Sequence, residues 1–206
     1  MSNEYVQVLF DDKDVLKIAL RMGNLWRNTP VVITRAANKA AAKVRTDIDK
    51  ETTERYLTQK RAVHRTGALH KATYSTLSAQ LVYKDTFRNL ARWAGHPGGN
   101  AVRPLYPHQG WNNDKPKNYF AHVKRSNALK ALTGEGEIPF RQEAKGYNLL
   151  FRRTGRSRYP IKGVAAPAIP QVVKNKDTLN TVSKTAYEVM SKEAARQMEL
   201  YLSGKL

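Results

Sequence analysis

A long run of small and apolar residues at helical spacing constrains this chain more than any other feature. Thr29 and Pro30 are residue types that favour the N-cap and the first position of a helix. After them, apolar side chains recur three and four residues apart, at Ile33, Ala37, Ala40, Val44 and Ile48. The lysines and arginines between them fall mainly on other faces. The pattern predicts a helix from 29 to about 56, with an alanine stripe that lets a second helix or a sheet approach closely.

Downstream, the hydrophobic period becomes that of a strand. In ATYSTLSAQLVYKDTF, every second residue from Leu77 to Tyr83 is apolar, which predicts a strand with one buried face. YFAHVK and YNLLFRR are further candidate strands. The second leads through TGRS into a return strand, RYPIKGV, so we expect a β-hairpin with an arginine-rich tip. A last helical stripe runs from Leu179 to Tyr201, with Gly204 as the expected C-cap.

The remaining segments are expected to connect or extend this framework. YVQVLF is expected to be a short strand or an arm that pairs with another chain, followed by an amphipathic helix that starts near Asp14. We therefore expect residues 1–28 to form an N-terminal arm with a short helix, and residues 29–206 to form a single domain. The Gly/Pro-rich residues from about 95 to 118 are expected to form an excursion. Pro167 and Pro170 predict an extended connector with at most a turn of helix.

These elements define the expected fold class. A long N-terminal helix, an antiparallel β-sheet with a basic hairpin and a C-terminal helix make an α+β protein. The chain contains no cysteine, so neither a disulfide framework nor a thiolate metal site is available. The N-terminus lacks the basic region of a signal peptide, and no apolar run is long enough for a membrane span. We expect a soluble protein that is made in the cytoplasm and has no membrane partner.

Positive charge is concentrated in the middle of the chain. The formal net charge is +19, yet residues 1–30 and residues 177–206 each hold four acids and four bases. The surplus therefore lies within residues 31–176, which hold 28 bases and 9 acids. Three stretches contain no acid at all, at 55–84, 115–134 and 144–176. Such a field favours a polyanion or an acidic protein as neighbour and is salt sensitive, and a solvated basic surface is the alternative.

The predicted hairpin carries the candidate binding residues. They are the cations of RRTGRSRYPIKG, namely Arg152, Arg153, Arg156, Arg158 and Lys162. We expect them to face DNA or an acidic partner and to contact phosphates without reading bases, because no Asn or Gln lies among them.

The sequence shows no convincing catalytic, cofactor or metal site. The five histidines do not have metal-ligand spacing, and no phosphate-binding loop or nucleophile elbow is present. Glu143 and Lys145 match the E-x-K fragment of metal-dependent nucleases, but an exposed charged turn is the favoured interpretation. The segment from Pro167 to Pro170 is formally P-x-x-P, and a connector is favoured over a polyproline ligand. We expect no enzymatic activity.

The order of elements resembles that of a known family. A basic, Ala-rich helix in VVITRAANKAAAKVRTDIDK is followed by TLSAQLVYKD, YFAHVK, the hairpin LLFRRTGRSRYPIKGV and APAIPQVVKN before a last helix. This arrangement resembles the minor tail protein Z family of tailed bacteriophages over roughly residues 30 to 203. The resemblance lies in the order of elements and in motifs that contain no catalytic signature. The N-terminal arm and the excursion at 95–118 have no counterpart in the family pattern.

The resemblance implies a structural role in the virion. It implies a tail-completion protein at the head–tail neck, assembled in the host cytoplasm as a ring oligomer around the DNA channel. Its partners would be copies of itself, other neck and tail proteins such as the tail terminator, and DNA in the channel. A free nucleic-acid-binding protein without sequence specificity and an assembly chaperone are the alternatives.

Overall fold

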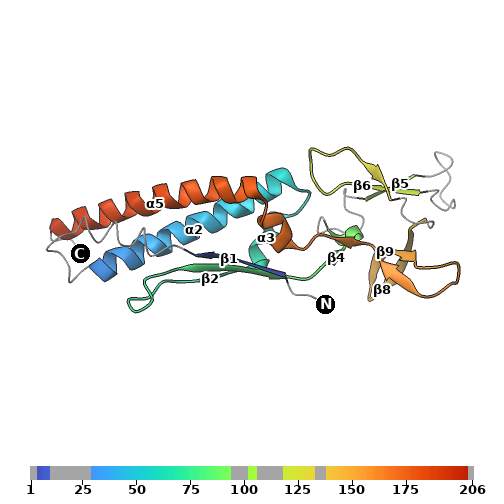
Figure 1. Cartoon of the computed structure of the whole chain (residues 1–206), viewed down its shortest axis with the longest axis horizontal. Helices are drawn as coiled ribbons and strands as arrows, with labels where there is room; N and C mark the ends of the chain where they lie inside the picture. Colours follow the sequence, from blue (N-terminus) through green and yellow to red (C-terminus); the bar gives the residue numbers. More distant parts are fainter. Residues whose placement is uncertain (1–3, 10–28, 94–101, 106–117, 133–137, 204–206) are drawn as a thin grey trace. The chain divides into compact units, whose positions relative to one another are not determined.

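The computed structural model describes residues 4–9, 29–93, 102–105, 118–132 and 138–203, and it shows an α+β chain as expected (Figure 1). Two helices of 27 residues dominate it, one near each end of the chain. The described elements are, in order, β1 (Glu4–Leu9), α2 (Thr29–Arg55), α3 (Lys60–Thr66), β2 (Gly67–His70), β3 (Gln80–Asp85), β4 (Arg88–Asn89), the 3-10 helix η2 (Leu90–Arg92), β5 (Val102–Leu105), β6 (Asn118–Ala121), β7 (Lys130–Ala131), β8 (Phe140–Ala144), β9 (Tyr147–Arg153), β10 (Ile161–Gly163), β11 (Ala165–Ala166), α4 (Ile169–Val173) and α5 (Lys176–Leu202).

The chain divides into two compact units, each built from segments that are distant in sequence. Unit 1 comprises Met1–Glu51, Val63–Asp85 and Ile169–Leu206, and it contains α5, most of α2 and one sheet. Unit 2 comprises Thr52–Ala62 and Thr86–Ala168, and it contains the remaining strands.

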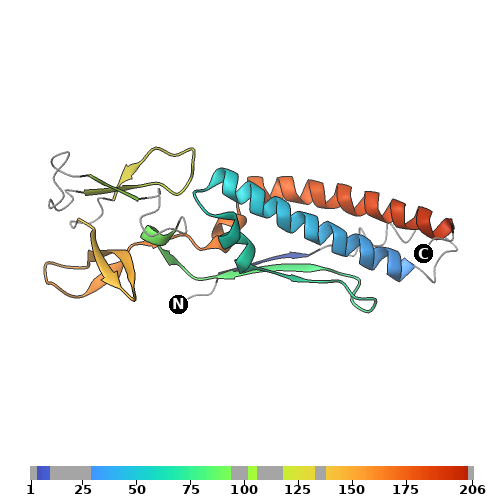
Figure 2. The same ribbon diagram turned by 180° about the vertical axis from the view of Figure 1, so that it is seen from behind.

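In unit 1, α2 lies between α5 and the three-stranded sheet, and the two helices run antiparallel (Figures 1 and 2). Two sides of α2 are therefore covered. Its buried apolar residues are Val32, Ile33, Ala36, Ala37, Ala40, Ala41, Val44 and Ile48. The predicted helix and its alanine stripe are confirmed, and the small side chains allow α2 to pack closely on both neighbours.

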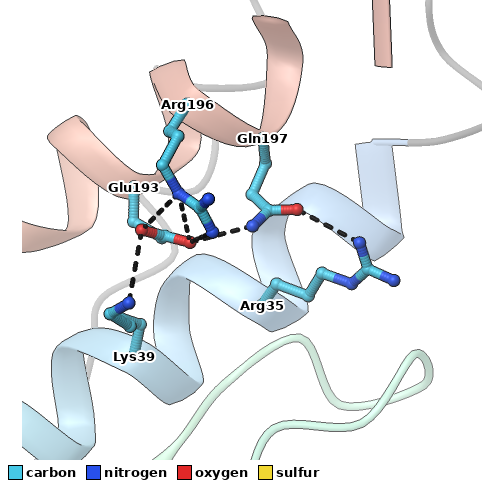
Figure 3. Close-up of polar contacts among 5 residues, drawn as sticks. All are labelled: Arg35, Lys39, Glu193, Arg196 and Gln197. Atoms are coloured by element: carbon cyan, nitrogen blue, oxygen red, sulfur yellow. Dashed lines mark hydrogen bonds and ion pairs between the residues drawn. The ribbon is translucent and has the colours of Figure 1, made fainter. Parts of the chain in front are cut away.

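A polar cluster lies on the facing sides of α2 and α5 (Figure 3). The Glu193 carboxylate accepts a two-nitrogen hydrogen bond from Arg196 and one of 2.8 Å from Gln197 Nε2, and it lies 3.8 Å from Lys39 Nζ. Arg35 in turn donates to Gln197 Oε1 at 3.1 Å. Glu193 and Gln197 are both buried. Their contacts with α2 place residue 193 beside residue 39 and residue 197 beside residue 35. The cluster therefore specifies the antiparallel register of the two helices.

The sheet of unit 1 has the order β1-β3-β2, and all of its pairs are antiparallel. Ala79, Leu81 and Tyr83 are fully buried, which confirms the predicted buried face of the strand. Residues 4–9 pair with β3 of the same chain, from Glu4 opposite Asp85 to Leu9 opposite Gln80. Of the two expectations for this segment, the intramolecular strand is therefore the one observed. The helix expected from Asp14 lies outside the described residues.

Strand β3 begins three residues later than the alternation suggested, because a turn precedes it. Leu77 has a φ of 50°, a left-handed conformation that is incompatible with a strand, so the strand cannot include Leu77. The turn is held by hydroxyl groups, since Thr73 N–H donates to Thr76 Oγ1 and Thr76 N–H donates to Thr73 Oγ1. Asn38 of α2 accepts from Ala72 N–H at 2.7 Å and donates to its carbonyl at 3.1 Å. The turn is thereby fastened to α2.

Replacing Asn38 by alanine is expected to loosen this turn. Two hydrogen bonds to a buried backbone group are lost, which costs about 1–2 kcal/mol of unfolding free energy. Urea unfolding measures the loss, and amide hydrogen exchange at 72–76 should accelerate. Lys43→Ala, an exposed change on the same helix, serves as control and should change stability by less than about 0.5 kcal/mol. Unchanged exchange at 72–76 in the Asn38 variant would show that the turn holds itself.

The proline-containing connector is largely buried. Ala168, Ile169 and Pro170 are buried, and α4, which starts at Ile169, packs against β1 and β3. Pro170 is tolerated because it occupies the first turn, where its missing N–H has no helical acceptor. The prediction of a connector with one turn of helix is confirmed, and the segment is not an exposed polyproline ligand.

Helix α5 then begins after Asn175, whose side chain accepts from Asp177 N–H, and it ends at the C-cap Ser203. The expected cap, Gly204, lies outside the described residues.

Unit 2 is made of small antiparallel sheets, with the orders β10-β9-β8, β5-β6-β7 and β11-β4. Asn89 links two of these sheets, since its side chain donates to the Leu150 carbonyl at 2.7 Å and accepts from Leu150 N–H at 3.0 Å. Leu150 is fully buried, as is Trp93 after η2. Within the predicted strand YNLLFRR, now β9, the structure buries Leu150 and leaves Tyr147 exposed.

Candidate functional site

Unit 2 holds most of the surplus positive charge. It contains 18 of the 36 lysines and arginines but only 5 of the 17 acids, so its formal net charge is +13. Unit 1 has the same number of bases and 12 acids, which leaves +6. The sequence located the charge in the middle of the chain, and the structure assigns about two thirds of the formal net charge to unit 2. Unit 2 is therefore the part of the protein best suited to an anionic partner.

The predicted hairpin forms, and its strands place the cations on two faces. Tyr147–Arg153 pairs with Ile161–Gly163, so that Arg152 lies opposite Lys162 and Arg153 lies opposite Ile161. Because side chains alternate along a strand, Arg152 and Lys162 share one face and Arg153 belongs to the other. Arg152 and Lys162 are both exposed, whereas Arg153 is half-buried. The five candidate cations are therefore not equivalent.

Arg153 has a structural role in the hairpin. Its Nη1 donates to the Arg158 carbonyl at 2.7 Å, and its guanidinium lies 5.2 Å from the centre of the Phe140 ring. Thr154 adds two bonds across the loop, since its N–H and its Oγ1 both donate to the Pro160 carbonyl, at 3.2 and 3.1 Å. These contacts close the loop from 154 to 160.

The other four cations are available to a partner. Arg152, Arg156, Arg158 and Lys162 are exposed, and none of them forms an ion pair with a carboxylate of the described residues. The Arg158 guanidinium lies 5.7 Å from the centre of the Tyr159 ring, which is itself 61% exposed. Guanidinium and ammonium groups bind phosphate or carboxylate oxygens, and arginine does so with two parallel hydrogen bonds. The arrangement can hold anionic groups.

Substituting Arg153 is expected to release the loop, whereas substituting Arg156 is not. Arg153→Ala removes the bond to the Arg158 carbonyl and the contact with the Phe140 ring, a local loss of about 1 kcal/mol. Amide hydrogen exchange at 154–159 should therefore accelerate in Arg153→Ala and stay at the wild-type rate in the matched control Arg156→Ala. Equal exchange rates in the two variants would assign Arg153 to the same exposed class as its neighbours.

The E-x-K fragment has the geometry of a turn between strands. Glu143 is exposed near the end of β8, opposite Asn148, and Lys145 occupies a left-handed turn position with a φ of 53°. Asp114, an upstream acid in the Gly/Pro-rich stretch, lies outside the described residues. Within the described ranges, no group of three or more His, Asp or Glu side chains could hold a metal ion.

A pair of polar residues in unit 1 was not anticipated. His64 Nδ1 lies 2.6 Å from Asp49 Oδ2, and the Asp49 side chain is only 1% exposed. Arg45, one helical turn before Asp49, donates to the carbonyls of His64 and Gly67 at 2.9 and 2.8 Å. In the sequence, Arg45 and Asp49 are only two polar residues one helical turn apart, and this spacing does not show which residues they contact. The cluster fastens the junction of α3 and β2 to α2.

Comparison with known proteins identifies no relative: no family model, no curated protein and no solved structure matches the chain. Among the helices that the structure describes, none is both long and apolar enough to cross a membrane.

Proposed function

We propose that this protein is a structural component of a tailed-phage virion, a tail-completion or minor tail protein that forms part of a ring around the DNA channel at the head–tail neck. The observation that carries the proposal is the separation of charge between the units. Unit 1 has a well-filled core of two long helices and a sheet, while unit 2 carries a formal net charge of +13 and presents exposed cations. Such a division suits a protein that packs against protein neighbours and lies close to DNA.

The resemblance in element order supports the same proposal. The basic alanine-rich helix, the strand through Tyr83, the hairpin and the last helix all occur in the order that the resemblance implies. The partners would be copies of the chain and neighbouring neck and tail proteins, such as the tail terminator. The proposed role requires binding and assembly and includes no chemical reaction.

Mass spectrometry of purified particles tests the proposal. We expect the protein at about a few to a dozen copies per particle, as suits one cyclic ring. Cross-linking within the particle should join it to itself and to neck proteins. Its absence from particles made in cells that express it would refute the structural role, and an abundant capsid protein measured in the same sample serves as the standard.

A free nucleic-acid-binding protein without sequence specificity is the second candidate. The exposed cations without carboxylate partners favour it, because they would serve a free protein equally well. Gradient fractionation of an infected lysate separates the two: a free protein sediments away from particles with nucleic acid, and an assembly chaperone does so with precursor tails. Magnesium-dependent DNA cleavage that Glu143→Ala abolishes would instead require an enzyme.

A further inference from the structure

We propose that the β9–β10 hairpin binds the phosphodiester backbone of nucleic acid through Arg152, Lys162, Arg156 and Arg158, and that bound phosphate relieves repulsion between the two strand cations. The inference deepens the proposed function and rests on it for where the nucleic acid is met, namely the DNA of the tail channel. The binding itself is a property of the isolated chain and is tested on it.

Like charges are paired across the two strands of the hairpin. Arg152 and Lys162 are directly opposite in the register. Directly opposite residues of an antiparallel pair have Cβ atoms about 5 Å apart, and like charges at this distance destabilise the sheet. Neither residue forms an ion pair with a carboxylate in the described part of the chain. A phosphate between the two side chains would turn a destabilising pair into a binding site.

The loop between the two strands is organised before any ligand binds. Arg153 and Thr154 close it through the carbonyls of Arg158 and Pro160. The loop that carries Arg156 and Arg158 therefore avoids much of the ordering cost that an unstructured loop would incur on binding. The half-buried Arg153 supports the four exposed cations and is a positioning residue.

The composition of the loop favours nucleic acid over an acidic protein as the partner. Protein interfaces depend on a central apolar cluster that is fully desolvated on binding. The loop from 154 to 160 offers a single large ring, Tyr159, among small and polar residues and arginines. Phosphate backbones need no apolar centre, since contacts from Arg and Lys position the protein on them. No Asn or Gln lies between 152 and 162 to pair with a base, so binding should not depend on sequence.

Charge reversal at Lys162 tests the proposal, because binding and stability should change in opposite directions. Lys162→Glu creates an attractive pair with Arg152, so the thermal midpoint should rise by about 1–4 °C. Affinity of the purified full-length protein for a mixed-sequence DNA duplex should fall, and the slope of log Kd against log salt should shrink by about one to two. Lys162→Thr should show a smaller rise in the thermal midpoint and a smaller loss of DNA affinity. This variant tests the proposal if Lys162→Glu does not fold.

Lys145→Asp is the matched control. It makes the same charge change at the other end of the same sheet, in a left-handed turn that aspartate tolerates. We expect its salt slope to stay within about half a unit of the wild-type value. Single-stranded DNA, duplex DNA and RNA distinguish the source of the phosphates, and all three should respond to Lys162→Glu.

Several results would overturn the proposal. They are an unchanged salt slope in Lys162→Glu, an equal loss in Lys145→Asp, and tighter binding to poly-glutamate than to DNA, which would indicate an acidic protein partner. Failure here leaves the particle test intact, since a protein found in the virion with no DNA affinity keeps its structural role. Conversely, DNA binding that depends on Lys162 in a protein absent from particles would retain this inference and refute the proposed function.

Discussion

Replacing Gly67 by alanine is expected to destabilise unit 1 by about 2 kcal/mol. A Cβ at this position would lie 2.6 Å from Cε1 of the Tyr83 ring, closer than real Cβ contacts come. The ring is fully buried on the central strand and cannot move aside without disturbing the core. Urea or thermal unfolding of the variant measures the loss.

A double-mutant cycle with Tyr83→Leu identifies the cause of that loss. If the collision with the ring is responsible, alanine at position 67 should cost much less in the Tyr83→Leu background. An equal cost in both backgrounds would instead assign the effect to the backbone of Gly67. Tyr83→Phe is a useful companion, because the buried hydroxyl has no hydrogen-bond partner among the described residues. Its removal should be neutral or slightly stabilising.

Replacing Glu193 by glutamine is expected to lower the unfolding free energy by about 2 kcal/mol at neutral pH. The hydrogen bond from Arg196 lowers the pKa of Glu193 from its ordinary 4.5 to about 2, helped by Gln197 and Lys39 and opposed by burial. Glutamine has nearly the same shape as glutamate but lacks the negative charge that these donors stabilise. Chemical unfolding at pH 7 measures the difference, and Glu188→Gln, exposed on the same helix, should have little effect.

The stability difference between the wild type and Glu193→Gln should depend on pH. A carboxylate with a lowered pKa in the folded state contributes its full stability above its ordinary pKa and loses it as the pH falls toward the folded value. The gap between wild type and Glu193→Gln should therefore be constant above about pH 5 and shrink between about 4.5 and 2. A gap that stays constant down to pH 2 would show that the charge of Glu193 is not what stabilises the cluster.

Elements with strong local signals were predictable. The start of α2 at the Thr29–Pro30 pair, its alanine stripe and the strand that buries Leu81 and Tyr83 depend on periodicity and capping, which act within a few residues. The β9–β10 hairpin followed from two strand patterns around a glycine-containing turn. The prolines likewise indicated a connector with one turn of helix, now seen as α4.

Other features depend on contacts between distant residues and had no local signal. Leu77 looked like a strand residue because it continues the alternation, but it follows the hydroxyl-bonded turn at 73–76 and has a left-handed conformation. The burial of Glu193 and Gln197 had no local signal, because burial of a charge is acceptable only once partners from another helix or the next turn are in place.

The candidate site shows the same division. The sequence by itself determined that the chain is α+β, that its charge lies between the two ends and that a hairpin carries five cations, because composition and periodicity are properties of the chain alone. Only the tertiary structure decided that Arg153 closes the loop while Arg152 faces Lys162, and that most of the charge belongs to unit 2. Strand register and long-range packing place each side chain, and both are set by partners far away in sequence.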